Sequence, residues 1–442
     1  MDRRELLQVG FSGLLGLGLS RSAHAVPEAK AKKVLMIFLT GAPSHIDTFD
    51  PKPDAIEDIR GLFKPIATKV PGIQICEHLP LTAARADKFA IVRSMTHGVP
   101  VHELGTHFLL SGIDALPPGS NHMATRHDWP NYASGLEYAK PRTDGIPNGV
   151  LLPTYLNAGY GFSGQNGGVL GAKFDPWHVT SDPNSVGFKA GELQTLGLSV
   201  DQLRNREALL KSVDHQQTLM EKVAEGKQFT EKQTKAFGLL TGGKLASAFD
   251  LGRESVATRD RYGRHLFGQS LLLSRRLLET GVPYVQAHMG AMNNWDTHTG
   301  NCEQLKTRLL PPFDMAYSAL LDDLESRGLL SETLVVTVGE FGRTPKMGTD
   351  NGGNITGKDG RDHWGGCFFA LFAGGGVRGG QVIGKSDKQA AYPAMNPYKP
   401  SDLGATVYEA LGVDPGREVI DRGGRPMTLN RGTAIKALFS GA

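Results

Sequence analysis

Continuous apolar runs that each end in a polar loop recur along this chain, and they constrain its fold more than any other feature. Lys33 to Leu39 reads KVLMIFL and is followed by TGAPSH, and Leu334 to Val338 reads LVVTV and is followed by GEFGRTPK. A run that is apolar at every position is typical of a strand buried on both faces of a sheet. We expect further strands at Phe89 to Arg93, Val150 to Leu152, Val282 to His288 and Cys367 to Ala373.

Helical segments separate these runs. Leu266 to Leu278, Gln304 to Arg327 and Asp402 to Leu411 carry helical spacing of apolar residues. Parallel strands need a crossover connection, so the alternation predicts an α/β fold: a doubly wound, mostly parallel sheet flanked by helices on both faces. We expect residues 155–250, with an irregular glycine-rich first part and a helical second part, to be an insertion near the cleft.

The N-terminal segment indicates export. Residues 1–25 contain the pair Arg3-Arg4, an apolar stretch too short to span a bilayer, and the small-residue sequence AHA. This is typical of a twin-arginine signal peptide. We expect residues 26–442 to form a single periplasmic or extracellular domain without a membrane span. The formal net charge is +3 without a basic block, which argues against a nucleic-acid partner.

Polar clusters follow four of the expected strands. Ligands bind at the carboxyl ends of the strands in open α/β sheets, so we expect these clusters to meet at one edge. Their imidazoles and carboxylates suit a divalent metal ion. The clusters are Ser44, His45, Asp47 and Asp50; His97, His102, Glu103 and His107; Asn293, Asn294, Asp296 and His298; and Glu340 and Arg343, followed after a loop by Arg361, Asp362 and His363.

Five ordered motifs resemble a known family. GAPSHIDTFDPKP, RSMTHGVPVHELGTHFLLSG, WDTH, GEFGRTPK and GRDHW occur in this order from about residue 33 onward. Together they resemble the bacterial exported family catalogued as domain of unknown function 1501. That family is grouped with the alkaline-phosphatase-like superfamily of phosphatases, sulfatases and phosphoglycerate mutases. The resemblance implies an alkaline-phosphatase-like sheet with the active site at its strand ends.

The resemblance also implies metal ligands. Asp296, His298 and His363 match the Asp, His and later His that hold one metal in two-metal members of the superfamily. Glu340 and Asp47 are the candidates for the second metal, although Phe341 stands where the superfamily has a histidine. One site is therefore favoured over two, with zinc, manganese or calcium as the ion.

The nucleophile position is altered. Sulfatases carry a cysteine or serine ten residues before the glycine of a Leu-Thr-Gly sequence, and here that count from Gly112 reaches His102. His102 is then a nucleophile, or a metal ligand or general acid/base, or catalysis has been lost. Arg343 suits bidentate binding of phosphate or sulfate oxygens, or else pairs with Glu340 to hold its loop.

These residues predict an exported metal-dependent hydrolase of phosphate or sulfate esters. His102 and Arg343 are the expected catalytic residues, and His45, His107 and Arg361 the expected substrate-binding residues. The substrate would be a small-molecule or polysaccharide ester. The alternative is a non-catalytic carbohydrate- or surface-binding protein that keeps the fold with a degenerate site.

Overall fold

The computed structural model describes residues 31–114, 124–157, 161–188, 243–290, 294–351 and 356–441. The predicted signal peptide and most of the helical part of the insertion lie outside these residues. Among the described residues, no helix combines the length and apolar character needed to cross a membrane.

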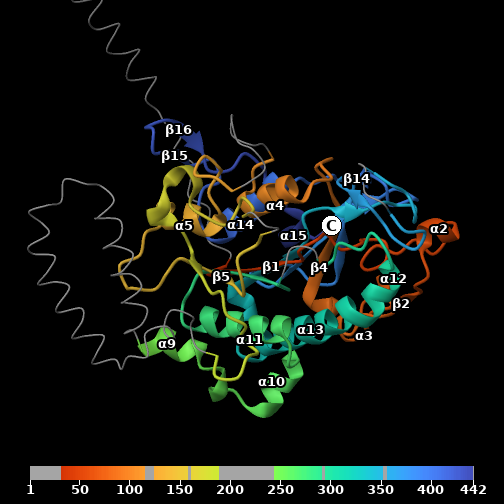
Figure 1. Cartoon of the computed structure of the whole chain (residues 1–442), viewed down its shortest axis with the longest axis horizontal. Helices are drawn as coiled ribbons and strands as arrows, with labels where there is room; N and C mark the ends of the chain where they lie inside the picture. The colour runs from red at the N-terminus through yellow and green to blue at the C-terminus, as the bar shows by residue number, and fades with distance from the viewer. Residues whose placement is uncertain are drawn as a thin grey trace, which may run out of the picture.

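One eight-stranded sheet organises the chain (Figure 1), with the strand order β12-β4-β11-β8-β1-β7-β5-β6. The central strands are β1 (Lys33–Phe38), β7 (Tyr284–His288) and β8 (Thr333–Val338), and β1 pairs in parallel with both neighbours. The outer strands are β4 (Phe89–Met95), β5 (Gly149–Leu152), β6 (Trp177–His178), β11 (Phe368–Ala373) and β12 (Gln381–Ile383). The predicted strand segments are therefore confirmed.

Strand β11 departs from the parallel pattern. It pairs antiparallel with both β8 and β4. The described residues between β8 and β11 form no crossover helix; they include a small antiparallel pair of β9 (Gly342–Arg343) and β10 (His363–Trp364) instead. A strand reached without a crossover can return in the opposite direction.

Helices cover both faces of the sheet, as predicted. Leu35 and Ile37 of β1 face a core with α11 (Leu266–Glu279) and α13 (Leu310–Ser326). Val34 and Met36 face the opposite core with α4 (His102–Ser111), α5 (Tyr132–Ala139) and α14 (Pro400–Ala410). The alternation along one strand fills two separate cores, which fixes the sheet as the middle layer.

The predicted helix over Gln304 to Arg327 divides into three parts. These are α12 (Asn301–Gln304), a π-helical turn (Leu305–Leu309) and α13. The two prolines occupy the first turn of α13, where a missing N–H costs little. A π-turn before them accommodates the change in hydrogen bonding.

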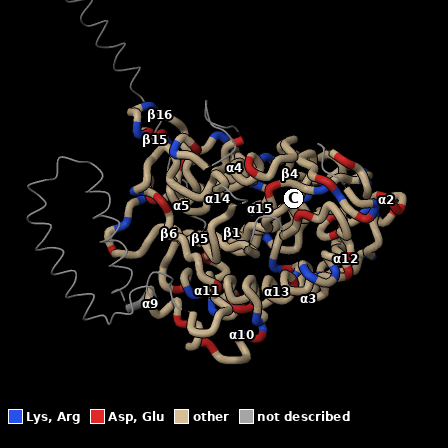
Figure 2. Tube along the Cα trace, viewed as in Figure 1, with Lys and Arg blue, Asp and Glu red and all other residues tan. Residues whose placement is uncertain are grey.

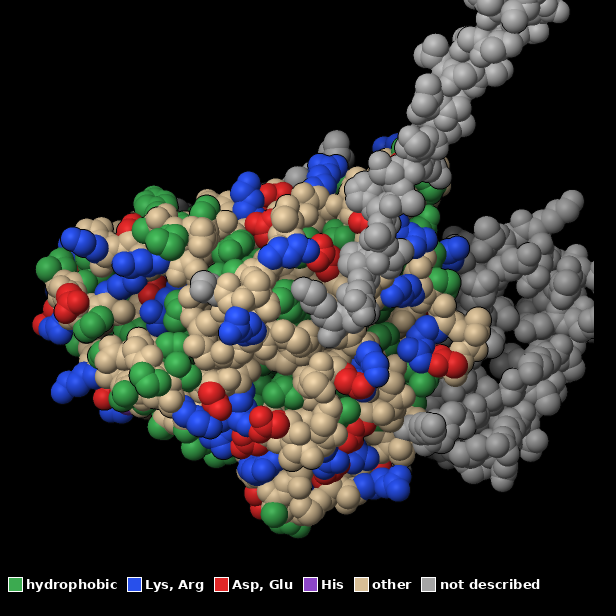
Figure 3. Space-filling view, turned by 180° about the vertical axis from the view of Figure 1, so that it is seen from behind, with side chains coloured by type: hydrophobic (Ala, Val, Ile, Leu, Met, Phe, Trp, Pro, Cys, Tyr) green, Lys and Arg blue, Asp and Glu red, His purple; other side chains and the backbone are tan. Residues whose placement is uncertain are grey.

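The sheet topology brings the four polar clusters to one edge. Strands β1, β4, β7 and β8 run in the same direction, because β11 reverses between β8 and β4. The loops after Phe38, Met95, His288 and Val338 therefore leave from the same side of the sheet. Charges of both signs are interspersed along the tube (Figure 2) and over the face seen from behind (Figure 3).

A buried ion network joins the helices on one face. The side chain of Arg275 on α11 is 1% exposed and lies 2.9 Å from Glu254, 2.6 Å from Glu279 and 2.9 Å from Asp323 of α13. Burial raises the pKa of Asp323 and of Glu254, but the arginines around them outweigh it and hold both values below their ordinary range. The folded protein therefore binds fewer protons here than the unfolded chain does in acid.

We expect Arg275→Leu to lower the free energy of unfolding at pH 7 by about 3 kcal/mol, because it removes the most buried of the cations that compensate Glu254 and Asp323. The parent should lose stability as the pH falls below the ordinary carboxylate pKa, since protons bind the unfolded chain more tightly. The variant should lose less over that range. Urea unfolding at pH 7 and in acid measures both effects. Exposed Arg253→Leu is the matched control, and an equal loss in both variants would contradict the assignment.

Candidate metal centre

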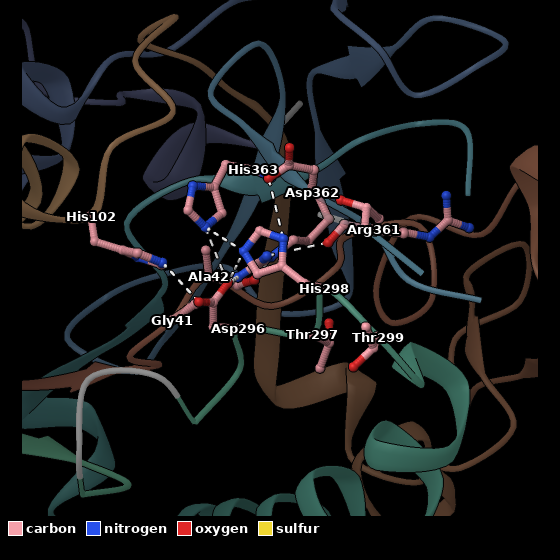
Figure 4. A network of polar contacts seen from close by, with 12 residues as sticks. Gly41, Ala42, His102, Asp296, Thr297, His298, Thr299, Arg361, Asp362 and His363 are labelled. Atoms are coloured by element: carbon pink, nitrogen blue, oxygen red, sulfur yellow. Dashed lines mark hydrogen bonds and ion pairs between the residues drawn. The ribbon is translucent and has the colours of Figure 1, made fainter. Parts of the chain in front are cut away.

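Three side chains converge at the strand-end edge (Figure 4). Asp296 and His298 lie in the loop after β7, and His363 lies on β10. Oδ1 of Asp296 is 2.9 Å from Nε2 of His298 and 3.1 Å from Nε2 of His363, and the two Nε2 atoms are 3.0 Å apart. The three residues predicted as ligands of one metal are thus mutual neighbours.

The contacts of Nδ1 indicate which ring nitrogen of each histidine carries the hydrogen. Nδ1 of His363 is 3.0 Å from the carbonyl oxygen of Pro100, and a carbonyl can only accept, so Nδ1 carries the hydrogen. Nδ1 of His298 is 3.3 Å from Oδ1 of Asp362, which likewise favours a hydrogen on Nδ1. Both Nε2 atoms then direct lone pairs at the Asp296 carboxylate. A ligating histidine ordinarily has such an outer hydrogen bond.

The convergence of these lone pairs fits a cation. Three acceptors at about 3 Å repel one another unless a positive charge lies between them. Ligand atoms about 2.1 Å from one ion lie about 3.0 Å apart at a right angle and about 3.4 Å apart at a tetrahedral angle. The observed separations agree with binding of one small divalent ion by Asp296, His298 and His363.

Arg343 holds the carboxylate of Asp296 in place. Its side chain is fully buried, and Nη2 donates to Oδ1 of Asp296 at 2.6 Å. Its other donors reach the carbonyl oxygens of Ala42, Arg361 and Gly41. With these donors engaged, Arg343 orients Asp296. Arg343 does not pair with Glu340 as expected. Its guanidinium group is also not oriented for the expected bidentate binding of a phosphate or sulfate group.

His102 lies beside the cluster at the start of α4. Its Nδ1 is 2.5 Å from Oε1 of Glu340, and its Nε2 is 3.4 Å from Oδ2 of Asp296. Burial lowers the pKa of His102, but the hydrogen bonds with Asp296 and Glu340 outweigh it and raise the pKa to about 9. Burial raises the pKa of Asp296, but the hydrogen bond from His102 and the charge of Arg343 outweigh it and hold the pKa far below its ordinary range. Without a metal, His102 is an imidazolium between two carboxylates.

Glu340 positions His102. Its Oε1 also accepts from the backbone N–H of Gly41 at 2.9 Å, while Oε2 is buried without a hydrogen bond. Two further groups of described residues that share His363 could also hold a metal: His102, Asp296 and His363, and His298, Asp362 and His363. Neither includes Glu340 or Asp47, so the second metal site expected from these two residues is not assembled.

Asp47 is occupied by other partners. Its carboxylate accepts from Arg361 at 2.7 Å, Ser44 at 2.6 Å and Asn301 at 2.9 Å. Arg361 is fully buried by this pairing and by bonds to backbone carbonyls. These two residues hold loops together and do not face the ligand cluster, which corrects the expected metal and substrate roles.

His45 and His107 are also enclosed. Nε2 of His45 is 2.8 Å from the carbonyl oxygen of Ala390, and burial lowers its pKa. His107 is fully buried within α4. Neither side chain is exposed enough to contact a substrate directly. The structure therefore places His45 and His107 in the interior and not at the expected substrate-binding surface.

The chain matches one known protein family. A family model described as Protein of unknown function (DUF1501) matches residues 31–439. The chain belongs to the DUF1501 family. No curated protein matches it in sequence.

Solved structures similar to this DUF1501 chain include sulfatases and phosphatases. Ps i-CgsB in complex with k-i-k-neocarrahexaose shares 12% identity over 91% of this chain and 75% of its own, with a TM-score of 0.42. The PsFucS1 sulfatase from Pseudoalteromonas sp. shares 13% identity over 93% and 72%, with a TM-score of 0.37. Alkaline phosphatase from the Antarctic bacterium TAB5 shares 10% identity over 86% and 98%, with a TM-score of 0.38.

Sequence reasoning did not assign a role to Asp362. In the DUF1501 chain its Oδ1 lies 3.3 Å from Nδ1 of His298 and accepts the backbone N–H of His363 at 2.7 Å. Asn351 donates to the backbone oxygen of His363 at 2.8 Å and was not anticipated at all. The Asp-His pair at 362–363 carried a signal, because a carboxylate next to a ligand often holds a neighbouring ligand. Asn351 lies in a loop without any motif.

We expect purified mature protein to take up about one equivalent of zinc or manganese, and His298→Ala or His363→Ala to bind less than about a tenth of it, since each removes one of three ligands. Metal analysis after dialysis measures this. Excess metal should raise the Tm of the parent by several degrees, because it binds only the folded state. Exposed His127→Ala is the control. Equal metal content in all four proteins would refute the centre.

Proposed function

We propose that this chain is an exported metal-dependent hydrolase of phosphate or sulfate esters. The observation that carries the proposal is the convergence of Asp296, His298 and His363 within 3.1 Å, with the outer nitrogen of His363 hydrogen-bonded to the carbonyl oxygen of Pro100. Export is supported by the signal-like segment at residues 1–25. An ester met outside the cytoplasm is therefore the proposed substrate.

The donor set favours one zinc or manganese ion over calcium. Two imidazole nitrogens and one carboxylate suit zinc and manganese, whereas calcium prefers six or more oxygen ligands. Three protein ligands leave coordination positions open, as in catalytic sites. A bound ion would supply Lewis acidity at the ester oxygen and lower the pKa of nearby water.

His102 is the proposed general acid. Glu340 holds Nδ1 at 2.5 Å, so that Nε2 points to the cluster, 3.4 Å from Oδ2 of Asp296. A water oxygen attacks phosphorus or sulfur and loses a proton to solvent; as the bond to the leaving oxygen breaks, His102 donates the Nε2 proton to that oxygen. Glu340 stabilises the imidazolium and fixes its orientation, as the acidic member of a catalytic triad does.

Arg343 takes a positioning role in this mechanism. It compensates the buried charge of Asp296 and ties that carboxylate to the loop after β1 through Gly41 and Ala42. The ligand atom of Asp296 is then fixed before metal or substrate arrives. Such preorganisation lowers the cost of assembling the site.

A nucleophilic role of His102 remains the second mechanism, and it makes a different covalent prediction. If Nε2 attacked phosphorus, a phosphohistidine would form and then be hydrolysed by water. The engagement of Nδ1 with Glu340 is compatible with either role. The two mechanisms differ in their dependence on the leaving group.

We expect His102→Gln to reduce kcat by about 100-fold or more for esters of poorly acidic alcohols, because such leaving groups need a proton. The loss should shrink several-fold for aryl esters such as p-nitrophenyl phosphate or sulfate, whose phenolate leaves unprotonated. Rates over a series of leaving groups measure this. Exposed His127→Gln should follow the parent.

Two results would contradict the acid role of His102 or the hydrolase assignment. An equal loss for all leaving groups, with a phosphorylated histidine trapped on rapid quenching, would contradict the acid role. No turnover of any ester by metal-loaded parent protein would favour the non-catalytic binding protein, which the missing hydroxyl or thiol at position 102 already suggests.

A further inference from the structure

His97 lies in the turn between β4 and α4, five residues before His102. Its Nε2 is 2.6 Å from the backbone carbonyl oxygen of Glu340, and its Nδ1 is 3.1 Å from the backbone nitrogen of Val99. A carbonyl can only accept and a backbone N–H can only donate, so the ring carries its hydrogen on Nε2 and a lone pair on Nδ1. His97 is therefore a neutral imidazole that makes one hydrogen bond at each nitrogen.

The surroundings of the His97 ring favour this neutral form. The ring centroids of Phe108, Phe341 and Phe368 lie 5.7, 6.5 and 5.3 Å from that of His97. Burial lowers the pKa of His97 and outweighs the opposite effect of its hydrogen bond with Glu340. The imidazole therefore keeps one tautomer, with Nε2–H directed at the carbonyl oxygen of Glu340.

The backbone at Glu340 carries two side chains of the site. The Glu340 carboxylate is bonded to Nδ1 of His102 at 2.5 Å. The next residue, Phe341, is 1% exposed, and its ring centroid lies 5.0 Å from that of His102 and 4.9 Å from that of His363. Helix α4 packs closely on the same peptide, because a Cβ at Gly105 would lie 3.1 Å from the Glu340 carbonyl oxygen and 3.0 Å from the Phe341 ring. A rotation of this peptide would therefore displace the carboxylate that holds the proposed acid.

The Nδ1 atom of His97 supports a different part of the site. It accepts from the N–H of Val99 and so closes the turn that leads to Pro100, whose carbonyl oxygen is 3.0 Å from Nδ1 of His363. The backbone N–H of His97 also donates to the carbonyl oxygen of Gly365 at 3.1 Å. The two ring nitrogens therefore have separate effects. Nε2 supports the proposed acid, and Nδ1 supports the turn beside a candidate metal ligand.

We propose that His97 is a positioning residue, which aligns His102 by holding the backbone of Glu340. The bond from Nε2–H fixes the Glu340 carbonyl group, and the carboxylate of the same residue then meets Nδ1 of His102 in one orientation. An acid that is already held in the direction of proton transfer needs less reorganisation in the transition state. The acid step rests on the proposed function, whereas the alignment of His102 does not.

Two substitutions separate the roles of the two ring nitrogens. The amide nitrogen of glutamine can replace Nε2 as the donor to Glu340, and the amide oxygen of asparagine can replace Nδ1 as the acceptor from Val99. With saturating metal, we expect His97→Asn to lower kcat for alkyl esters by about tenfold, the size of one lost hydrogen bond. The loss should be much smaller for aryl esters, whose leaving group needs no proton. His97→Gln should keep the leaving-group dependence of the parent, as should the exposed control His127→Asn.

Nuclear magnetic resonance gives a measure that does not depend on turnover. Nitrogen chemical shifts of the metal-free parent should show the hydrogen of His97 on Nε2. The Nδ1 proton of His102, bonded to Glu340, should give a downfield proton resonance, which is assigned by its absence from His102→Gln. We expect this resonance to be retained in His97→Gln and in His127→Asn, and to be lost or moved upfield in His97→Asn.

Three results would overturn the assignment. They are a hydrogen on Nδ1 of His97, an unchanged His102 resonance in His97→Asn, and an equal loss of kcat for alkyl and aryl esters in that variant, which would indicate a general structural effect. The proposed function is tested separately. If the metal-loaded parent cleaves no ester while the resonances behave as expected, the hydrolase assignment fails and the positioning of His102 by His97 stands.

Discussion

The buried carboxylate of Asp296 is the interaction on which the arrangement of the site depends. Oδ1 receives Arg343 and faces the Nε2 atoms of His298 and His363, while Oδ2 faces His102. A carboxylate removed from water must be compensated, and here the compensating groups come from three separate strand-end loops. Arg343 adds the loop after β1 through two carbonyl oxygens. One negative charge thus determines where four loops meet.

The sequence predicted the strands and the polar clusters that follow them for the same reason. A strand buried on both faces is apolar throughout, and the polar residues that follow within about ten positions must lie at its carboxyl end. Asp296 and His298 after β7, and Glu340 after β8, were found in this way. The direction of β11 could not be predicted, since a buried strand is apolar in either orientation.

Pairing between distant polar residues is what sequence patterns could not provide. Arg343 and Arg361 both lie near the ligands, and Asp47 and Asp296 are both buried, yet the sequence does not say which arginine meets which aspartate. Oδ2 of Asp47 accepts from Arg361, Ser44 and Asn301, and these bonds hold the carboxylate away from the Asp296 cluster. The same residue types at the same sheet edge therefore divide into loop-holding pairs and a metal-binding cluster, and only the three-dimensional contacts separate them.

The two-residue strand β10 ties a candidate metal ligand to a loop outside the cluster. Successive residues of a strand point to opposite sides, so His363 turns to the ligand cluster while Trp364 turns to the 387–392 loop. Among the described strands, β10 pairs with β9 alone, where His363 lies opposite Arg343, the residue that holds Asp296. The position of one candidate ligand therefore depends on the same short antiparallel pair that carries the support of another.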